Sequence, residues 1–304
     1  MGIRVVFMGT PVFAKVSLER LYDEGCEIAG VFTQPDKPAN RGLKSATSPV
    51  KELAVERGTP VFQPITLRNG LALNILDTLK CDLIVVVAYG KLLPREILDM
   101  PPLGCINIHG SLLPEYRGAA PIQWAVLNGD KETGVTSMYM AEELDAGDTL
   151  FSRKLLIGEN ETTGELYSRL SILGADVLSE TIKAVFRSEA IGIPQNHSKA
   201  TFAPPLKKDM SPIDWSDTAA RIKNKVRGLN PWPIATAEFN GVVYKVFSVE
   251  IDNCNKKCVP GTIITADVKG LEVACADGSI IITELQAPGG KRMSSADYLR
   301  GHRV

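Results

Sequence analysis

Continuous apolar segments alternate with segments of helical periodicity along the N-terminal part of the chain. An uninterrupted apolar run such as 83–88 predicts a strand that is buried on both faces of a parallel sheet. The predicted strands cover 3–8, 27–33, 83–88, 104–109, 134–140 and 149–157, and the predicted helices cover 11–24, 49–57, 71–80, 121–127 and 163–186. Strands that alternate with helices predict an α/β fold with a doubly wound, mostly parallel, Rossmann-like sheet.

Several helix starts are marked by a hydroxyl residue. Thr10 and Ser48 each precede a proline, which favours the hydroxyl residue as the N-cap and the proline as the first helical residue. Thr162-x-x-Glu165 has the spacing of a capping box. The apolar residues behind it share one helical face, so we expect a long helix that packs on one side and ends near Phe186.

The pattern changes after this helix. Residues 190–208 contain three prolines among polar residues, which predicts a linker. A helix is then predicted at 218–228, and short strands at 236–240, 242–249, 261–266, 271–274 and 279–285. Turn pairs such as Asn240-Gly241 separate these strands, so we expect a small antiparallel β-barrel of the OB-like class. The predicted division is a domain at 1–189, a linker at 190–208 and a C-terminal domain at 209–304.

Composition excludes several classes of protein. The chain has 304 residues, a formal net charge of −1 and 44% hydrophobic residues, as expected for a globular protein of about two domains. Its longest apolar run is too short to cross a bilayer, and its first residues do not have the pattern of a signal peptide. We therefore expect a cytoplasmic protein without membrane contact. Cys254-x3-Cys258 has no second Cys/His pair at zinc-site spacing, so no metal site is expected.

Nucleotide-binding motifs are missing from the expected places. The turn after the first strand, Gly9-Thr10-Pro11, supplies one glycine, whereas a dinucleotide fingerprint needs three at fixed spacing. No Gly-x4-Gly-Lys-Ser/Thr loop occurs in the chain. The strand–turn–helix opening therefore does not predict a dinucleotide enzyme or a P-loop nucleotidase.

Candidate catalytic side chains gather at the end of the predicted strand 104–109. Asn107 and His109 are two residues apart, so their side chains point to the same face, at the sheet edge where α/β folds bind ligands. An amide beside an imidazole can stabilise an oxyanion and move a proton. Asp145, in the predicted loop 144–148, could orient the imidazole. Spacing alone indicates an acyl- or proton-transfer site, with a purely structural histidine as the alternative.

Longer patterns resemble one enzyme family. Residues 107–121 follow the pattern Asn-x-His-x-Ser-Leu-Leu-Pro-x-x-Arg-Gly-x-Ala-Pro, and Gly134-Val135-Thr136 and Leu144-Asp145-x-Gly147-Asp148 come after it. This combination is similar to the signature of enzymes that use 10-formyltetrahydrofolate. The segments 9–11, 32–42, 48–51, 85–90 and 230–233 narrow the resemblance to the methionyl-tRNA formyltransferases, over nearly the whole chain.

The resemblance implies an activity and roles for individual residues. The family transfers the formyl group of its co-substrate 10-formyltetrahydrofolate to the α-amino group of methionyl initiator tRNA, for translation initiation. The resemblance implies that Asn107 and His109 stabilise a tetrahedral intermediate, that Asp145 assists, and that no metal takes part. The folate-binding residues that it implies are Ser111, Leu112, Leu113, Pro114, Leu92, Leu93 and Leu144. It also implies that Arg41 and Lys208 contact the charged initiator tRNA, and we expect the enzyme to act as a monomer.

Simpler interpretations stand beside these assignments. Leu92 and Leu93 can be plain core residues, the loop 36–47 can be a solvated charged loop, and Lys208 can serve linker solubility. Arg117 can be a surface salt-bridge partner, and it is left out of the catalytic set. Two other functions use the same scaffold: a formyltransferase for a sugar-nucleotide amine or glycinamide ribonucleotide, and a non-catalytic RNA-binding protein. The presence of the Asn/His/Asp set counts against the second.

The near-zero net charge conceals an uneven distribution. From residue 206 onward the chain has 14 Lys and Arg against 11 Asp and Glu, whereas residues 1–205 have 20 against 24. The C-terminal part is therefore mildly basic and the N-terminal part is acidic. This balance excludes a bulk polyanion binder, but it is compatible with short-range contacts to a tRNA.

Overall fold

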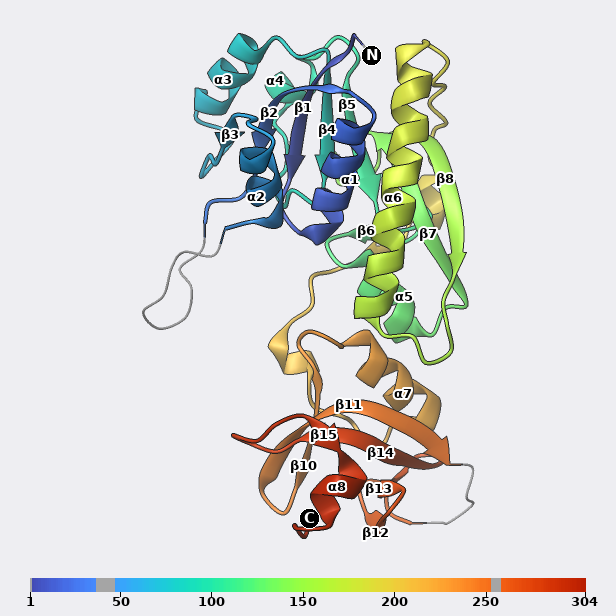
Figure 1. Ribbon diagram of the computed structural model, residues 1–304. Coiled ribbons are helices and arrows are strands. Elements are labelled where there is room, and N and C mark those ends of the chain that lie inside the picture. Colours follow the sequence, from blue (N-terminus) through green and yellow to red (C-terminus); the bar gives the residue numbers. More distant parts are fainter. Residues whose placement is uncertain (1, 37–46, 253–257) are drawn as a thin grey trace. The chain divides into compact units, whose positions relative to one another are not determined.

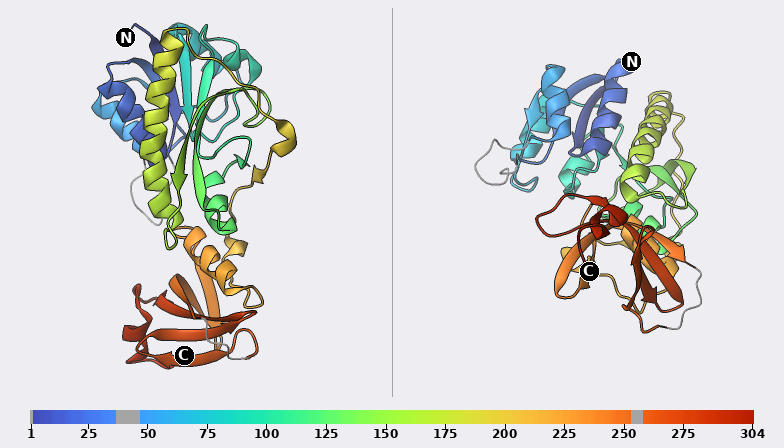
Figure 2. Two further views of the ribbon diagram at one scale, coloured as in Figure 1. Left: turned by 90° about the vertical axis from the view of Figure 1, so that its right-hand side faces the viewer. Right: turned by 60° about the horizontal axis from the view of Figure 1, so that its bottom comes forward.

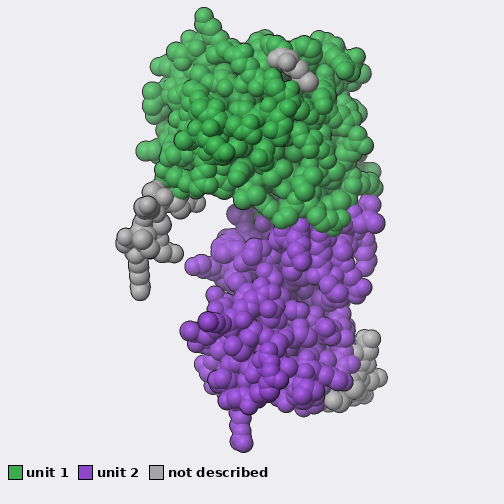
Figure 3. Space-filling view, viewed as in Figure 1, with its two compact units in different colours: residues 1–121, 133–155, 167–203 green, residues 122–132, 156–166, 204–304 purple. Residues whose placement is uncertain are grey.

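The computed structural model describes residues 2–36, 47–252 and 258–304, and the chain divides into two compact units (Figure 1, Figure 3). Unit 1 comprises residues 1–121, 133–155 and 167–203, and unit 2 comprises residues 122–132, 156–166 and 204–304. Each unit contains its own sheet.

Unit 1 contains a seven-stranded sheet. Its strands are β1 (Arg4–Gly9), β2 (Glu27–Phe32), β3 (Val61–Phe62), β4 (Leu83–Val87), β5 (Cys105–His109), β7 (Glu132–Tyr139) and β8 (Thr149–Leu156), in the order β3-β2-β1-β4-β5-β7-β8. The ladders from β3 to β5 are parallel, and β7 pairs antiparallel with β5. The mostly parallel sheet predicted from the apolar runs is confirmed.

Helices cover both faces of this sheet. They are α1 (Val12–Asp23), α2 (Pro49–Glu56), α3 (Leu71–Leu79), α4 (Arg95–Leu98) and α6 (Thr163–Phe186). Val6 of β1 belongs to a buried cluster with Leu76 of α3 and Ile97 of α4. Figures 1 and 2 show α1 and α6 on the opposite face, where the ring of Phe13 meets that of Tyr167 at 5.5 Å between centroids. Because strand side chains alternate between faces, both layers of helices bury apolar strand residues.

Two of the predicted helix caps form and one does not. Ser48 Oγ accepts a hydrogen bond from the Lys51 backbone amide at 3.1 Å. Thr162 and Glu165 form the reciprocal capping box, because each side chain accepts from the other's backbone amide, at 3.3 Å and 2.9 Å. The prediction for Thr10 is wrong, because Pro11 is the N-cap of α1. Thr10 Oγ1 instead accepts from the backbone amide of Gln34 at 3.3 Å, so it joins two strand ends.

Residues 190–203, expected from sequence as part of a linker, extend unit 1. Thr149 and Ile193 exchange two backbone hydrogen bonds, at 2.9 and 2.8 Å. β9 (Phe202–Ala203) pairs in parallel with β6 (Arg117–Gly118), and Gln195 between these points is buried. Prolines and polar residues signal the lack of regular structure, but they do not reveal that the chain bonds to residues far away in sequence.

Unit 2 is built on an antiparallel sheet. Its strands are β10 (Ala235–Phe239), β11 (Val242–Asp252), β12 (Ile263–Asp267), β13 (Gly270–Cys275), β14 (Gly278–Gln286) and β15 (Met293–Ser294), and its helices are α5 (Pro121–Asn128), α7 (Ala219–Gly228) and α8 (Ser295–Leu299). The strand order is β10-β11-β14-β13-β12, with β15 on β14. A buried core joins Ile222 and Val226 of α7 to the sheet residues Val246, Val273 and Ile282. The antiparallel C-terminal fold expected from the hairpin turns is confirmed.

Arg227 explains why two segments from earlier in the chain belong to unit 2. Its buried guanidinium donates to the carbonyl oxygens of Gly158 at 3.2 Å, Glu161 at 3.3 Å and Val126 at 3.5 Å. A buried guanidinium needs acceptors for its N–H groups. Backbone carbonyls of these segments accept from Nη1 and Nη2, and Oδ1 of Asn224 accepts from Nε at 2.9 Å. The segments 122–132 and 156–166 are therefore attached to α7.

The described residues contain neither a membrane-spanning helix nor a cluster of metal ligands. No helix there combines the length and the apolar character needed to cross a membrane. No group of three or more His, Cys, Asp and Glu residues there is arranged to hold a metal ion.

Candidate active site

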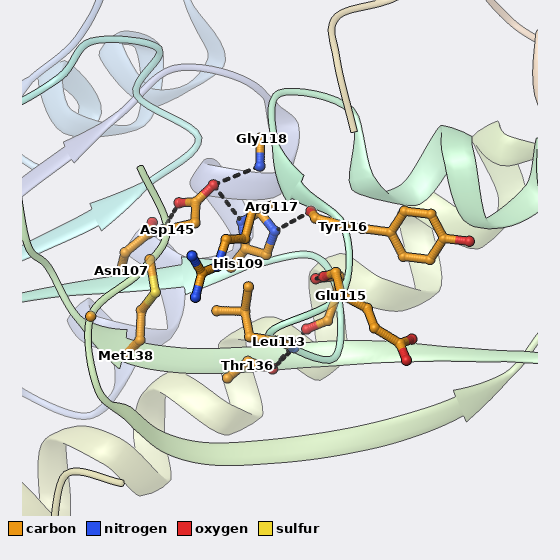
Figure 4. A network of polar contacts seen from close by, with 12 residues as sticks. Asn107, His109, Leu113, Glu115, Tyr116, Arg117, Gly118, Thr136, Met138 and Asp145 are labelled. Atoms are coloured by element: carbon orange, nitrogen blue, oxygen red, sulfur yellow. Dashed lines mark hydrogen bonds and ion pairs between the residues drawn. The ribbon is translucent and has the colours of Figure 1, made fainter. Parts of the chain in front are cut away.

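The C-terminal end of β5 brings two polar side chains into a buried position. Asn107 and His109 are 9% and 6% exposed, and both lie on the strand next to β7. Their spacing of two residues directs both side chains toward the loop that follows β7 (Figure 4). The fold therefore gives the side chains of Asn107 and His109 the shared direction that the sequence predicted.

Asp145, from that loop, contacts both residues (Figure 4). Its Oδ1 lies 3.5 Å from Nδ2 of Asn107, and its Oδ2 lies 3.6 Å from Nδ1 of His109. The backbone amide of Gly118 donates a hydrogen bond of 2.8 Å to Oδ2. The structure thus brings the three predicted catalytic side chains together, although Asp145 lies 38 positions from Asn107 in the sequence.

A backbone carbonyl fixes the orientation of the imidazole. Nε2 of His109 lies 2.9 Å from the carbonyl oxygen of Tyr116. A carbonyl can only accept, so Nε2 carries a proton, and Nδ1 is the nitrogen that can gain or lose one. At 3.6 Å the Nδ1–Oδ2 separation exceeds a hydrogen bond, which leaves Nδ1 available to a further atom.

The loop around Asp145 requires unusual backbone geometry. Asp145 itself has a φ of 50°, in the left-handed region that is unfavourable for a residue with a side chain. A Cβ on Gly147 would lie 1.9 Å from the carbonyl oxygen of Tyr139, so only glycine fits there. Gly118 has a φ of 120°, and a Cβ on it would lie 2.7 Å from the carbonyl oxygen of Ala203. Steric hindrance therefore explains why the motif has glycine at both positions.

The segment Ser111–Pro114 is anchored by β7. Thr136 Oγ1 donates to the carbonyl oxygen of Ser111 at 2.7 Å and accepts from the backbone amide of Leu113 at 3.2 Å. Ser111 is fully buried, and its hydroxyl donates to the carbonyl oxygen of Glu115 at 2.5 Å. Leu112 lies against Gly134, where a Cβ would come within 2.4 Å of the leucine side chain. The peptide bond between Leu113 and Pro114 is cis.

The three leucines expected at a folate site differ in exposure. Leu92 and Leu144 are 59% and 47% exposed, whereas Leu93 is buried in the cluster that α3 and α4 cover. An ion pair of 3.8 Å between Arg95 and Glu142 joins the segment of Leu92 to the loop of Leu144. Leu92 and Leu144 can therefore meet a ligand directly, and Leu93 packs in the core.

Arg117 is buried, which overturns its interpretation as a surface residue. It is 1% exposed, and its Nε and Nη2 donate to Oε1 of Gln195 at 3.2 and 2.7 Å. Its Nη1 lies 3.5 Å from a carboxylate oxygen of Glu143. Sequence reasoning missed Gln195, because no motif surrounds it and its partners are 48 to 78 residues away.

The structure describes only one of the two residues expected to contact tRNA. Arg41 lies outside the described residues. Lys208 is exposed and begins the short 3-10 helix η2 (Lys208–Met210) in unit 2.

Two family models match this chain. The model described as Formyl transferase matches residues 3–182, and the model described as Formyl transferase, C-terminal domain, matches residues 205–303. The first covers more than half of the chain and includes the whole Asn107–His109–Asp145 arrangement.

Curated relatives match over nearly the full length. A methionyl-tRNA formyltransferase from Alkaliphilus oremlandii is 49% identical over 302 residues, which is 99% of this chain and 97% of the relative. One from Acetivibrio thermocellus is 47% identical over 303 residues, again 99% of this chain and 97% of the relative.

Solved structures of lower identity share the fold. An N-formyltransferase from Helicobacter canadensis, in complex with folinic acid and dTDP-3-aminofucose, matches with a TM-score of 0.68 at 17% identity, over 92% of this chain and 98% of that one. HypX from Aquifex aeolicus, in complex with tetrahydrofolic acid, matches with a TM-score of 0.65 at 20% identity, over 98% of this chain and 47% of that one. By the family models and the curated relatives together, this chain belongs to the formyl transferase family, in the group of the methionyl-tRNA formyltransferases.

Proposed function

We propose that this enzyme transfers the formyl group of 10-formyltetrahydrofolate to the α-amino group of methionyl initiator tRNA, for translation initiation. The names of relatives at 47–49% identity support this acceptor. The observation that carries the chemistry is the position of the Asp145 carboxylate, within 3.6 Å of both Asn107 and His109.

The reaction needs stabilisation of negative charge on the formyl oxygen. When the amine nitrogen attacks the formyl carbon, a C–N bond forms and the carbonyl electron pair moves onto oxygen. Nδ2 of Asn107 and protonated Nδ1 of His109 supply the two hydrogen-bond donors for that oxygen. Both side chains are buried, and a site with little water makes such donors more effective.

Proton movement completes the transfer. The attacking amine becomes positively charged and releases a proton to the Asp145 carboxylate, because both nitrogens of His109 already carry one. The bond between the formyl carbon and N10 of the folate then breaks, and N10 receives a proton as it leaves. Because Nε2 of His109 is bonded to the Tyr116 carbonyl, Nδ1 is the nitrogen that gives N10 this proton, and the proton held on Asp145 then returns to Nδ1.

The folate and tRNA assignments belong to the same proposal. Leu92 and Leu144 offer exposed apolar surface that suits the flat pterin ring, beside the anchored segment Ser111–Pro114. Residues 1–189 carry the catalytic function, and residues 209–304 hold the tRNA with a mildly basic composition. Arg41 and Lys208 contact the tRNA, and the enzyme acts as a cytoplasmic monomer without a metal.

A formyl-transfer assay with competing acceptors tests the function. Purified enzyme receives 10-formyltetrahydrofolate together with either charged initiator tRNA or a nucleotide-linked amino sugar, and formylated product is measured by mass spectrometry. We expect product with the tRNA and none with the sugar. Transfer to the sugar alone would contradict the proposed tRNA acceptor. Asn107→Ala is the inactive control in the assays with either acceptor.

A further inference from the structure

A buried glutamine outside the predicted catalytic set contacts the backbone of the Asp145 loop. Nε2 of Gln195 donates to the carbonyl oxygen of Asp145 at 2.9 Å and to that of Gly147 at 2.7 Å. The same nitrogen lies 3.9 Å from Sδ of Met138, the β7 residue that pairs with Asn107. One amide group therefore touches both the catalytic loop and the strand beside the catalytic asparagine.

Arg117 determines which way this amide faces. A guanidinium has only donors, so the Gln195 atom that it contacts at 3.2 and 2.7 Å must be the oxygen. The NH2 group then faces the two carbonyls, which can only accept. Arg117 is 1% exposed and Gln195 is 8% exposed, so water does not compete for these bonds.

The Asp145 loop needs such support. A non-glycine residue at a φ of 50° costs free energy, and it keeps this conformation only where the surroundings hold it. Gly118 holds the carboxylate at 2.8 Å, and Gln195 holds the backbone on either side of Ala146. Without Gln195, the backbone could turn and move the carboxylate away from His109.

We propose that Gln195 is a positioning residue for the formyl transfer, which fixes the Asp145 carboxylate against Asn107 and His109. The inference rests on the proposed function. Gln195 acts through the backbone of Asp145, and among the described residues no hydrogen bond joins it to Asn107 or His109. The segment that appeared in sequence as a linker therefore completes the active site.

Two variants separate positioning from folding. Gln195→Ala removes both donations and also leaves Nε of the buried Arg117 without its acceptor, so it lowers both stability and activity. Gln195→Glu has nearly the same shape and keeps an oxygen for Arg117, but it places a second oxygen against the two carbonyls. We expect Gln195→Glu to stay folded while kcat falls about 10²-fold, as for a misplacement of about 1 Å, with KM for the folate within about threefold.

Asn196→Ala is the matched control. Asn196 is the next residue and is exposed, and its side chain bonds to Ser198 and not to the Asp145 loop. We expect it to keep wild-type kcat. The pH profile of kcat should change in both Gln195 variants, because the carboxylate no longer faces the imidazole, and it should not change in Asn196→Ala.

Amide hydrogen exchange gives a readout that does not depend on activity. Residues 142–148 should exchange faster in the Gln195 variants than in the wild type or Asn196→Ala. Wild-type kcat and pH profile in Gln195→Glu would overturn the inference. If the wild-type enzyme does not formylate the charged tRNA, the proposed function fails. The positioning role is tested separately: it is overturned if residues 142–148 exchange at the wild-type rate in the Gln195 variants.

Discussion

The backbone amide of Gly118 donates a hydrogen bond of 2.8 Å to Oδ2 of Asp145, the same oxygen that lies 3.6 Å from Nδ1 of His109. The amide therefore aims the carboxylate at the imidazole. Gly118 is also held by the parallel pairing of β6 with β9, which comes from the segment 190–203. The geometry of the catalytic set thus depends on a part of the chain far from its motif.

Removal of the Asn107 amide should abolish most activity. Asn107→Ala removes one of two oxyanion donors, so we expect kcat to fall about 10²–10³-fold. Binding of charged initiator tRNA, measured by filter retention, should persist. A kcat within about threefold of the wild type would contradict the oxyanion role.

Two substitutions of Asp145 should differ in stability and agree in activity. Asp145→Ala and Asp145→Gly both remove the carboxylate, so both should be nearly inactive. Alanine keeps the strain at a φ of 50°, whereas glycine relieves it, so Asp145→Gly should be about 1 kcal/mol more stable. Urea unfolding compares the two, and equal stability would argue against strain at this residue.

Gly147 should not tolerate a side chain. A Cβ there would lie 1.9 Å from the Tyr139 carbonyl oxygen, so Gly147→Ala must displace the backbone of the catalytic loop. We expect a loss of about 1–3 kcal/mol of unfolding free energy and a lower kcat. Gly301→Ala, where a Cβ meets nothing within 4 Å, serves as the control and should match the wild type in both measurements.

The capping box of α6 should contribute to acid sensitivity. The backbone amide and then the hydroxyl of Thr162 hold the pKa of Glu165 below its ordinary value of 4.5. The carboxylate therefore stabilises the folded state above that value, and this contribution is lost as the pH falls through the lowered pKa. Stability of the wild type should drop more steeply at acid pH than that of Glu165→Gln.

Chemical denaturation at a series of pH values measures this difference. Glu56→Gln, which changes an exposed carboxylate on α2, is the control and should follow the wild-type curve. Parallel curves for the wild type and Glu165→Gln would show that the capping box contributes nothing to the acid sensitivity.

Lys208 should contribute to the salt dependence of tRNA binding. One phosphate contact adds about 1 to the slope of log affinity against log salt concentration, so Lys208→Ala should reduce that slope by about 1. Lys269→Ala removes the same charge from another exposed site of unit 2 and should leave the slope unchanged. Equal slopes of log affinity against log salt concentration for both variants would contradict the tRNA contact and favour a role of Lys208 in solubility.

Patterns along the chain predicted most of the elements of both units. Apolar runs such as 83–88 are typical of strands that are buried on both faces of a parallel sheet, and hydroxyl caps such as Ser48 act within one turn of a helix. The Asn107–His109 pair was predictable for the same reason, since strand geometry fixes the direction of residues two apart. The Thr10 cap failed because a tertiary partner, the Gln34 amide, competes for its hydroxyl.

The sequence by itself determined the local structure, the family resemblance and the identity of the candidate catalytic side chains. Only the tertiary structure decided how those side chains are held: the Nε2 bond of His109 to Tyr116, the strained backbone of Asp145, and the burial of Arg117 with Gln195. The physical reason is that these features depend on how separate segments pack together: Tyr116 is 7 positions from His109, and Gln195 is 78 positions from Arg117. Hydrogen bonds between residues up to 78 positions apart leave no periodicity and no local composition by which a sequence pattern could reveal them.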